Sequence, residues 1–174
     1  MITFRVCPHD TKRGLKKWEE IAKKIEKIFD DKVNFKPYKN FFEQDAYLTT
    51  NEKPEIYYAN LDTALQLLQK NYKIIGKFKN QYDNFVLITL AKEEKEKLNI
   101  ISVADKLSSF YILYKLKLYQ KDILLSGSYE EVIEDIINEK ADVGILFKDH
   151  YEELQENIKS QIKILQEINL SFSH

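Results

Sequence analysis

The chain has 174 residues, of which 44% are hydrophobic and 32% are charged, so it is globular and long enough to bury a core. A net charge of −1 argues against nucleic-acid binding, which needs a basic surface. One cysteine, Cys7, excludes a disulfide framework, and no apolar run is long enough to span a membrane. No signal peptide precedes the first apolar run. We therefore expect a cytoplasmic protein as given, or a periplasmic one if a leader was removed.

The first half of the chain alternates between strand and helix periodicities. Asp10 or Thr11 is expected to cap a long amphipathic helix that reaches Phe29, and Asn60 is expected to cap a second helix. Residues 38–50 are ambiguous. The predicted elements of this half are strands over 2–7, 32–37 and 55–58, the long helix, and a helix over 61–68.

In the second half, residues 92–97 form a solvated charge run, and Ser102 is expected to cap a short turn over 103–107. Short connections between alternating elements predict a largely parallel α/β architecture. The predicted strands cover 72–78, 84–91, 110–116, 123–125, 143–147 and 162–168, and a helix runs from Asp149 to about Ile158.

The segment 125–147 is the most informative part of the chain. Gly127 permits a tight turn, and Ser128 with Glu131 forms the Ser-x-x-Glu pattern of a capping box at a helix start. The N–H groups of such a helix start are suited to an anionic or polar ligand. The simpler interpretation, which is the more frequent one, is a capped surface helix in an ordinary α/β domain.

Four motifs occur in the order found in the type II periplasmic binding proteins, and the sequence most resembles the phosphate/phosphite/phosphonate-binding subunits of ABC importers. Each motif alone is weak, whereas the ordered set covers most of the chain. The motifs are Arg5-Val6-Cys7-Pro8 before the long helix, Pro54 to Asn60 before a Leu-rich helix, Ile100 to Leu107, and Gly127-Ser128-Tyr129 with the downstream strand Ala141 to Gly144.

The resemblance implies a two-lobed α/β fold with mixed, mostly parallel sheets flanked by helices. Lobe 1 would span 1–86, lobe 2 would span 87–165, and 166–174 would return to lobe 1. A small polar or anionic ligand would lie between the lobes, and a membrane transporter or a signalling protein would be the partner. Hinge strands are expected near 84–90 and 166–171.

Two departures from the family pattern stand out. The family's Ser-Thr-Ser-Gly loop, which cradles the oxyanion at a helix start, has no counterpart, because the predicted strand 110–116 passes almost directly into the next strand. Tyr129 stands where the family has a histidine. The chain is also shorter than a full binding protein, so it resembles a truncated member that lacks the oxyanion helix.

The candidate ligand-binding residues lie in loops that follow predicted strands. For Asp10, Asn60 and Ser128 helix capping alone is an equally good explanation. Of Tyr57 and Tyr58, which alternate along a strand, one should pack inward and the other should reach a cleft. The full set is His9, Asp10, Thr11, Tyr57, Tyr58, Asn60, Ser126, Ser128 and Tyr129, together with Pro8 and Gly127.

The histidines are too far apart in sequence to suggest a metal site, and we expect no cofactor. A triad of Ser126 or Ser128 with His9 and Asp142 lacks the Gly-x-Ser-x-Gly signature of a nucleophile elbow. The leading hypothesis is a non-catalytic solute-binding or sensing domain. The alternative is a degenerate binding-protein fold that serves as a protein-interaction module, with exposed apolar surface around Leu116, Leu118 and Tyr119. A small enzyme on this fold is a third possibility that no motif supports.

Overall fold

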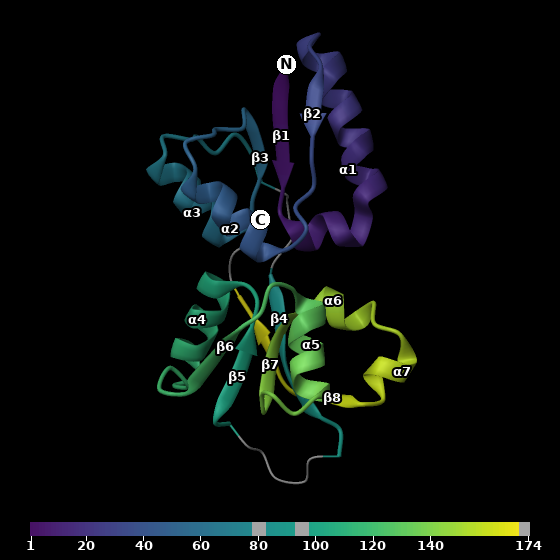
Figure 1. Ribbon diagram of the computed structural model, residues 1–174, viewed down its shortest axis with the longest axis vertical. Coiled ribbons are helices and arrows are strands. Elements are labelled where there is room, and N and C mark those ends of the chain that lie inside the picture. Colours follow the sequence, from purple (N-terminus) through teal and green to yellow (C-terminus); the bar gives the residue numbers. More distant parts are fainter. Residues whose placement is uncertain (78–82, 93–97, 171–174) are drawn as a thin grey trace. The chain divides into compact units, whose positions relative to one another are not determined.

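The computed structural model describes residues 1–77, 83–92 and 98–170, and it divides the chain into two compact units, Met1–Ile74 and Ile75–His174. Figure 1 shows the elements of both units. Each unit is a mixed α/β structure built on its own sheet, and the two are described separately below.

Unit 1 is built on a parallel sheet of three strands in the order β2-β1-β3. Strand β1 spans Ile2–Val6, β2 spans Val33–Phe35 and β3 spans Ile56–Tyr58. Phe4 and Val6 of β1 are buried and pack with Trp18 and Ala22 of helix α1 to form the core of this unit. Arg5 lies between Phe4 and Val6, so it points to the opposite face of the sheet.

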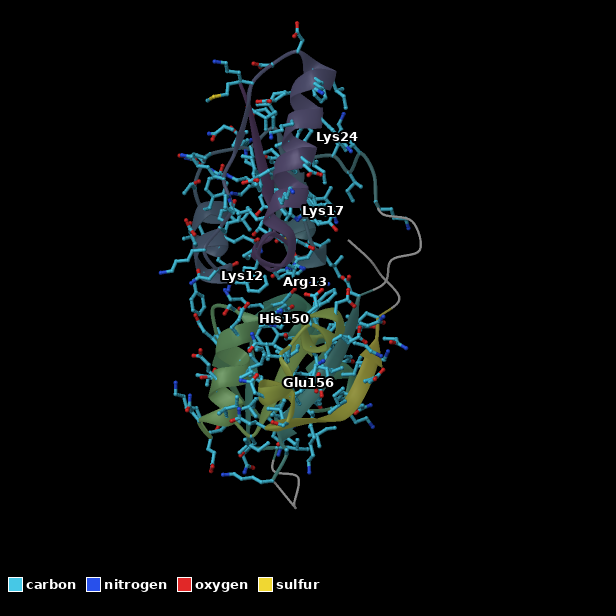
Figure 2. All side chains as sticks on the ribbon, turned by 90° about the vertical axis from the view of Figure 1, so that its right-hand side faces the viewer. Lys12, Arg13, Lys17, Lys24, His150 and Glu156 are labelled. Carbon is cyan, nitrogen blue, oxygen red and sulfur yellow. The ribbon has the colours of Figure 1, made fainter. Side chains whose placement is uncertain are left out.

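Helix α1, Pro8–Phe29, starts without a side-chain cap. Pro8 occupies its first turn, where a missing N–H costs nothing, so the expected cap by Asp10 or Thr11 is wrong. Gly14 has an extended backbone (φ −165°, ψ 52°) that sets the first turns at an angle to the rest of the helix (Figure 1). Lys12, Arg13, Lys17 and Lys24 are spread along α1 (Figure 2), as on the solvated side of an amphipathic helix.

The ambiguous segment 38–50 contains helix α2, Phe41–Thr49, and the predicted helix after Asn60 is α3, Leu61–Gln69. The Asn40 and Asn60 side chains cap these helices by accepting hydrogen bonds from Glu43 N and Thr63 N. The two helices are joined by a buried hydrogen bond from Gln44 Nε2 to Thr63 Oγ1, 2.8 Å long.

Unit 2 is built on a five-stranded sheet in the order β6-β5-β7-β4-β8. Strands β6, β5 and β7 are parallel, whereas β4 runs antiparallel to both β7 and β8. The hinge segments predicted near 84–90 and 166–171 lie largely in β4 and β8, which pair from Asn84↔Asn169 to Leu90↔Ile162. The strands are β4 Asn84–Leu90, β5 Ile100–Val103, β6 Asp122–Leu125, β7 Val143–Phe147 and β8 Ile162–Asn169.

Helices α4, Lys106–Lys115, and α5, Tyr129–Ile137, connect the parallel strands of this sheet. The chain moves from β5 outward to β6 through α4, and then back past β5 to β7 through α5. Right-handed crossovers in opposite directions place the two helices on opposite faces of the sheet, as Figure 1 shows. Ser102 of β5 and Gly144 of β7 are register partners on the face that α5 covers.

Three predictions of secondary structure are wrong. Residues 110–116 belong mainly to helix α4 rather than to a strand, because a short apolar run fits both structures and Asp105 caps a helix here. Ser102 lies inside β5 and caps nothing. Residues 72–77 form no strand, and Ile74 and Ile75 are exposed, since no neighbouring strand pairs with this segment.

The predicted helix 149–158 is divided into α6, Lys148–Glu152, and α7, Glu156–Lys159. Residue 78 of the predicted strand 72–78 and residues 93–97 of the charge run lie outside the described residues.

Candidate functional site

The topology of unit 2 points to the carboxyl ends of β5 and β6 as a place for a ligand. These strands are neighbours, yet the helices that follow them lie on opposite faces, so the connections after Val103 and Leu125 diverge. In open α/β sheets this divergence marks the ligand-binding edge. Both helices that start here are long enough to carry a helix dipole with its positive end at the edge.

The start of α4 is rich in buried polar groups. Asp105 caps the helix, with its Oδ1 accepting a hydrogen bond from Ser108 N at 3.2 Å. Asp105, Ser108 and Ser109 are all at least 95% buried. The hydroxyl of Ser109 is enclosed and has no hydrogen-bond partner among the described residues. We call this group of Asp105, Ser108 and Ser109 the α4 site.

The α4 site corrects one expectation from the sequence. The helix between β5 and β6 was expected to be missing, and it is present as α4 with two serines in its first turn. The signal for it was an Asp-x-x-Ser pattern at Asp105 and Ser108, which is a helix-capping arrangement. A turn over 103–107 capped by Ser102, as expected from the sequence, would include Asp105, and Ser109 is therefore not among the predicted site residues.

The start of α5 is capped as predicted. Ser128 Oγ accepts a hydrogen bond from Glu131 N at 3.2 Å, and the Glu131 carboxylate accepts one from Gly127 N at 2.7 Å. Tyr129 is only 2% exposed and lies against the rings of Phe147 and His150, at centroid distances of 6.5 and 5.5 Å. Truncating Tyr129 would therefore test packing before it tests ligand binding.

Ser126 belongs to a buried network behind the edge. Its hydroxyl donates to Asp135 Oδ2 at 2.6 Å, the Ser102 hydroxyl donates to the same oxygen at 2.9 Å, and the two hydroxyls lie 2.9 Å apart. Lys140 Nζ lies 3.6 Å from the other oxygen of Asp135. The network joins β5 and the end of β6 to α5, so it holds the carboxyl ends of these two strands in place.

In unit 1, the predicted residues after β1 lie in the first turn of α1. His9 is 5% exposed and stacks on Phe41 of α2 at 5.9 Å, while its Nε2 lies 3.2 Å from Asp10 Oδ2. Thr11 is also buried and donates its hydroxyl hydrogen bond to Pro8 O. These contacts lie within the unit; His9 and Thr11 are buried, whereas Asp10 is half-buried.

Asn60 sits in the same unit at the end of β3. Its side chain caps α3, and its backbone N–H donates to Cys7 Sγ at 3.2 Å, which joins the ends of β3 and β1. Capping by Asn60 is confirmed, and its amide is 97% buried in this role. Cys7 itself is buried, as predicted.

Tyr57 and Tyr58 lie on opposite faces of β3. The Tyr58 ring packs on Trp18 at 4.5 Å in the core, whereas Tyr57 stacks on Tyr38 at 6.3 Å on the other face. Burial raises the pKa of the Tyr57 hydroxyl far above its ordinary range, so the hydroxyl remains protonated at physiological pH.

In the described residues, the serine and the aspartate of the possible triad have other partners. Ser126 donates to Asp135 rather than to a histidine, and Asp142 accepts hydrogen bonds from the N–H groups of Asn99 and Ile100. Within the described ranges, no group of three or more His, Cys, Asp or Glu side chains could hold a metal ion. In the same ranges, no helix combines the length and apolar character needed to cross a membrane.

Neither a known family model nor a curated protein matches the sequence. Solved structures do match. A binding component of a phosphonate ABC transporter from Pseudomonas aeruginosa superposes with a TM-score of 0.70 at 15% identity, over 99% of this chain. A methylphosphonate complex from Prochlorococcus marinus gives 0.71 at 16% identity over 97% of this chain. The chain has the fold of the type II periplasmic binding proteins.

Other proteins of this fold match as well, including an arginine-transport periplasmic binding protein from Legionella pneumophila, with a TM-score of 0.63 at 9% identity over 99% of this chain. The chain spans 66% of the Pseudomonas protein, 72% of the Prochlorococcus protein and 83% of the Legionella protein. The Pseudomonas and Legionella proteins are binding proteins of transport systems. At such identities the fold alone is shared.

Proposed function

We propose that the chain is a non-catalytic solute-binding domain and that the α4 site contacts a small polar or anionic solute. The observation that carries this proposal is the hydroxyl of Ser109, which is 99% buried at a helix start and has no hydrogen-bond partner among the described residues. A buried hydroxyl without a partner is costly, so such groups are expected where a ligand or water completes them. Its place at the diverging ends of β5 and β6 favours a ligand.

The charges at the α4 site narrow the class of solute. The dipole of α4 favours negative charge at its start, whereas the Asp105 carboxylate occupies the Ser108 N–H and opposes it. A dianion would feel that repulsion twice as strongly as a monoanion. The site therefore favours a monoanionic or neutral polar group that can both donate to and accept from hydroxyls, such as a singly protonated phosphonate, a carboxylate or an amino acid.

A thermal-shift screen with phosphate, phosphonates, sulfate, carboxylates and amino acids tests this proposal. A solute that binds only the folded state at about 100 times its Kd stabilises the fold by about 2.7 kcal/mol. Ser109→Ala should reduce that shift, while Ser160→Ala, which removes an exposed hydroxyl from the end of α7, should leave it unchanged. Absence of a shift with every solute would contradict the proposal.

Exposed aromatic side chains favour a second candidate, a protein-interaction module. Phe110, Tyr111 and Tyr114 on α4 are 46%, 47% and 71% exposed, and Tyr119 lies against Tyr114 with its ring centroid 6.1 Å away. Apolar surface of this kind is typical of sites that contact another protein, such as a membrane transporter or a signalling partner. Light scattering over a range of concentrations and co-purification with a partner would test it. A strictly monomeric protein that binds no partner would contradict it.

A further inference from the structure

Arg5 is a half-buried cation in unit 1 that the solute-binding proposal does not use. It lies on β1, on the face opposite the Phe4–Val6 core, and its register partner on β3 is Tyr57. The guanidinium lies over the rings of Tyr47 and Tyr38, with its Cζ 4.8 and 5.6 Å from their centroids. Aromatic faces stabilise a cation but leave its N–H donors unsatisfied.

The donors of Arg5 are only partly used. Nη1 donates to the backbone oxygen of Lys36 at 3.0 Å, whereas Nε is enclosed and has no acceptor among the described residues. Within those residues, no carboxylate lies at ion-pair distance from Arg5. A partly buried guanidinium without a counter-charge is unusual, because burial of charge is normally compensated by a pair.

Two further donors lie in the same cluster. The hydroxyls of Tyr38 and Tyr57 are enclosed and interact with each other, and neither has another partner among the described residues. Tyr38 is 5% exposed, and burial raises the pKa of its hydroxyl well above the ordinary range, as it does for Tyr57. Both hydroxyls therefore remain protonated at neutral pH, and one of them can donate to the other. The second hydroxyl and the Nε–H of Arg5 are then donors without an acceptor among the described residues, beside a positive charge.

The topology of unit 1 places this cluster where ligands are found. The chain passes from β1 to β2 through α1, and from β2 back past β1 to β3 through α2, so the connections after β1 and β2 lead to opposite faces. Lys36 and Tyr38 follow the end of β2 at this edge. The exposed side chains of Lys36 and Lys39 add positive potential there.

We propose that Arg5 and the hydroxyls of Tyr38 and Tyr57 form a binding site in unit 1 for a small oxyanion, a carboxylate or a phosphate group. The guanidinium fork matches the two oxygens of such a group, and the hydroxyls are two further donors. The Arg5 site belongs to unit 1, whereas the α4 site belongs to unit 2.

Arginine side-chain NMR tests the proposal directly in the full chain, because Arg5 and Arg13 are the only arginines. A ¹⁵N–¹H spectrum of the Nε–H groups should contain two signals, and Arg13→Lys identifies which one belongs to Arg5. Titration with acetate and with phosphate, each at constant ionic strength set by sodium chloride, should move the Arg5 signal to saturation and leave the Arg13 signal in place. The stronger of the two responses distinguishes a carboxylate from a phosphate site.

The hydroxyls are tested by Tyr38→Phe and Tyr57→Phe, which keep the rings in place. Each should weaken the anion affinity by about tenfold, since hydrogen bonds to charged groups are the strong ones. Tyr114→Phe, which removes an exposed hydroxyl from α4, is the matched control and should change nothing. Ser109→Ala should also leave the Arg5 titration unchanged, so a failure at the α4 site is distinguishable from a failure here.

Three results would overturn the Arg5 site. The first is that both arginine signals move together without saturation, as expected for ionic screening. The second is that chloride alone produces the same saturable change as the oxyanions. The third is that both Tyr→Phe variants bind the anion as tightly as the parent protein does.

Discussion

Gly144→Ala should destabilise unit 2, because the new methyl group would meet buried side chains. Gly144 lies in β7 beneath α5, and a Cβ at this position would lie 2.7 Å from Val132 Cγ1 and 3.2 Å from Cγ1 of both Ile136 and Ile88. All three neighbours are fully buried, so none can move into solvent. The closest of these distances is far shorter than the roughly 3.5–4.0 Å at which carbon atoms attract each other.

Two opposing terms set the size of the effect. Overpacking a dense core costs roughly 1–3 kcal/mol. Replacing glycine by alanine reduces the entropy of the unfolded chain. Where the native backbone accepts alanine, this raises the free energy of unfolding by about 0.4–1 kcal/mol. We therefore expect the free energy of unfolding to fall by about 1–2 kcal/mol. In a chain of this length, each kcal/mol lowers Tm by about 2–4 °C.

Urea unfolding followed by far-UV circular dichroism measures this loss. The only tryptophan, Trp18, lies in unit 1, so its fluorescence reports that unit separately. Gly76→Ala is the matched control, since no atom lies within 4 Å of a Cβ built there. Adding Val132→Ala to the Gly144→Ala protein should recover part of the lost stability, because it removes the methyl group closest to the new Cβ. Equal stabilities for the Gly144→Ala and Gly76→Ala proteins would refute the reasoning.

Three further predictions concern caps and titrating groups. Ser128→Ala should cost about 1 kcal/mol in urea unfolding through the lost cap on α5, and a cost near zero would show that the cap is not needed. The N–H of Thr3 donates a hydrogen bond to the Glu55 carboxylate and holds the pKa of that carboxyl below its usual range. The ionised Glu55 side chain therefore stabilises the fold above pH about 4.3, and this stabilisation is lost as the pH falls further. Glu55→Gln should therefore flatten the acid side of the stability–pH profile. Burial raises the pKa of Tyr72 to about 12, so stability is lost as the pH rises from about 10 through that value, and Tyr72→Phe should remove this alkaline loss.

The sequence determined those features that depend on residues close together along the chain. Asn60 and Ser128 were identified as caps because a short polar side chain before an apolar helical pattern satisfies the N–H groups of the first turn. The buried strand 143–147 was identified because its apolar run is bounded by turn residues. The ordered motifs indicated the type II periplasmic-binding-protein fold, which the solved structures share.

Tertiary structure decided the features for which local patterns fit two answers. Residues 110–116 suit a strand or a helix equally, and the choice followed from the Asp105 cap and from burial of Ile112 and Leu113 between exposed neighbours. The Ser102–Ser126–Asp135 network and the Arg5 cluster each join residues from three separate segments. Only the crossovers of the chain bring such segments together, so no spacing along the sequence could reveal them.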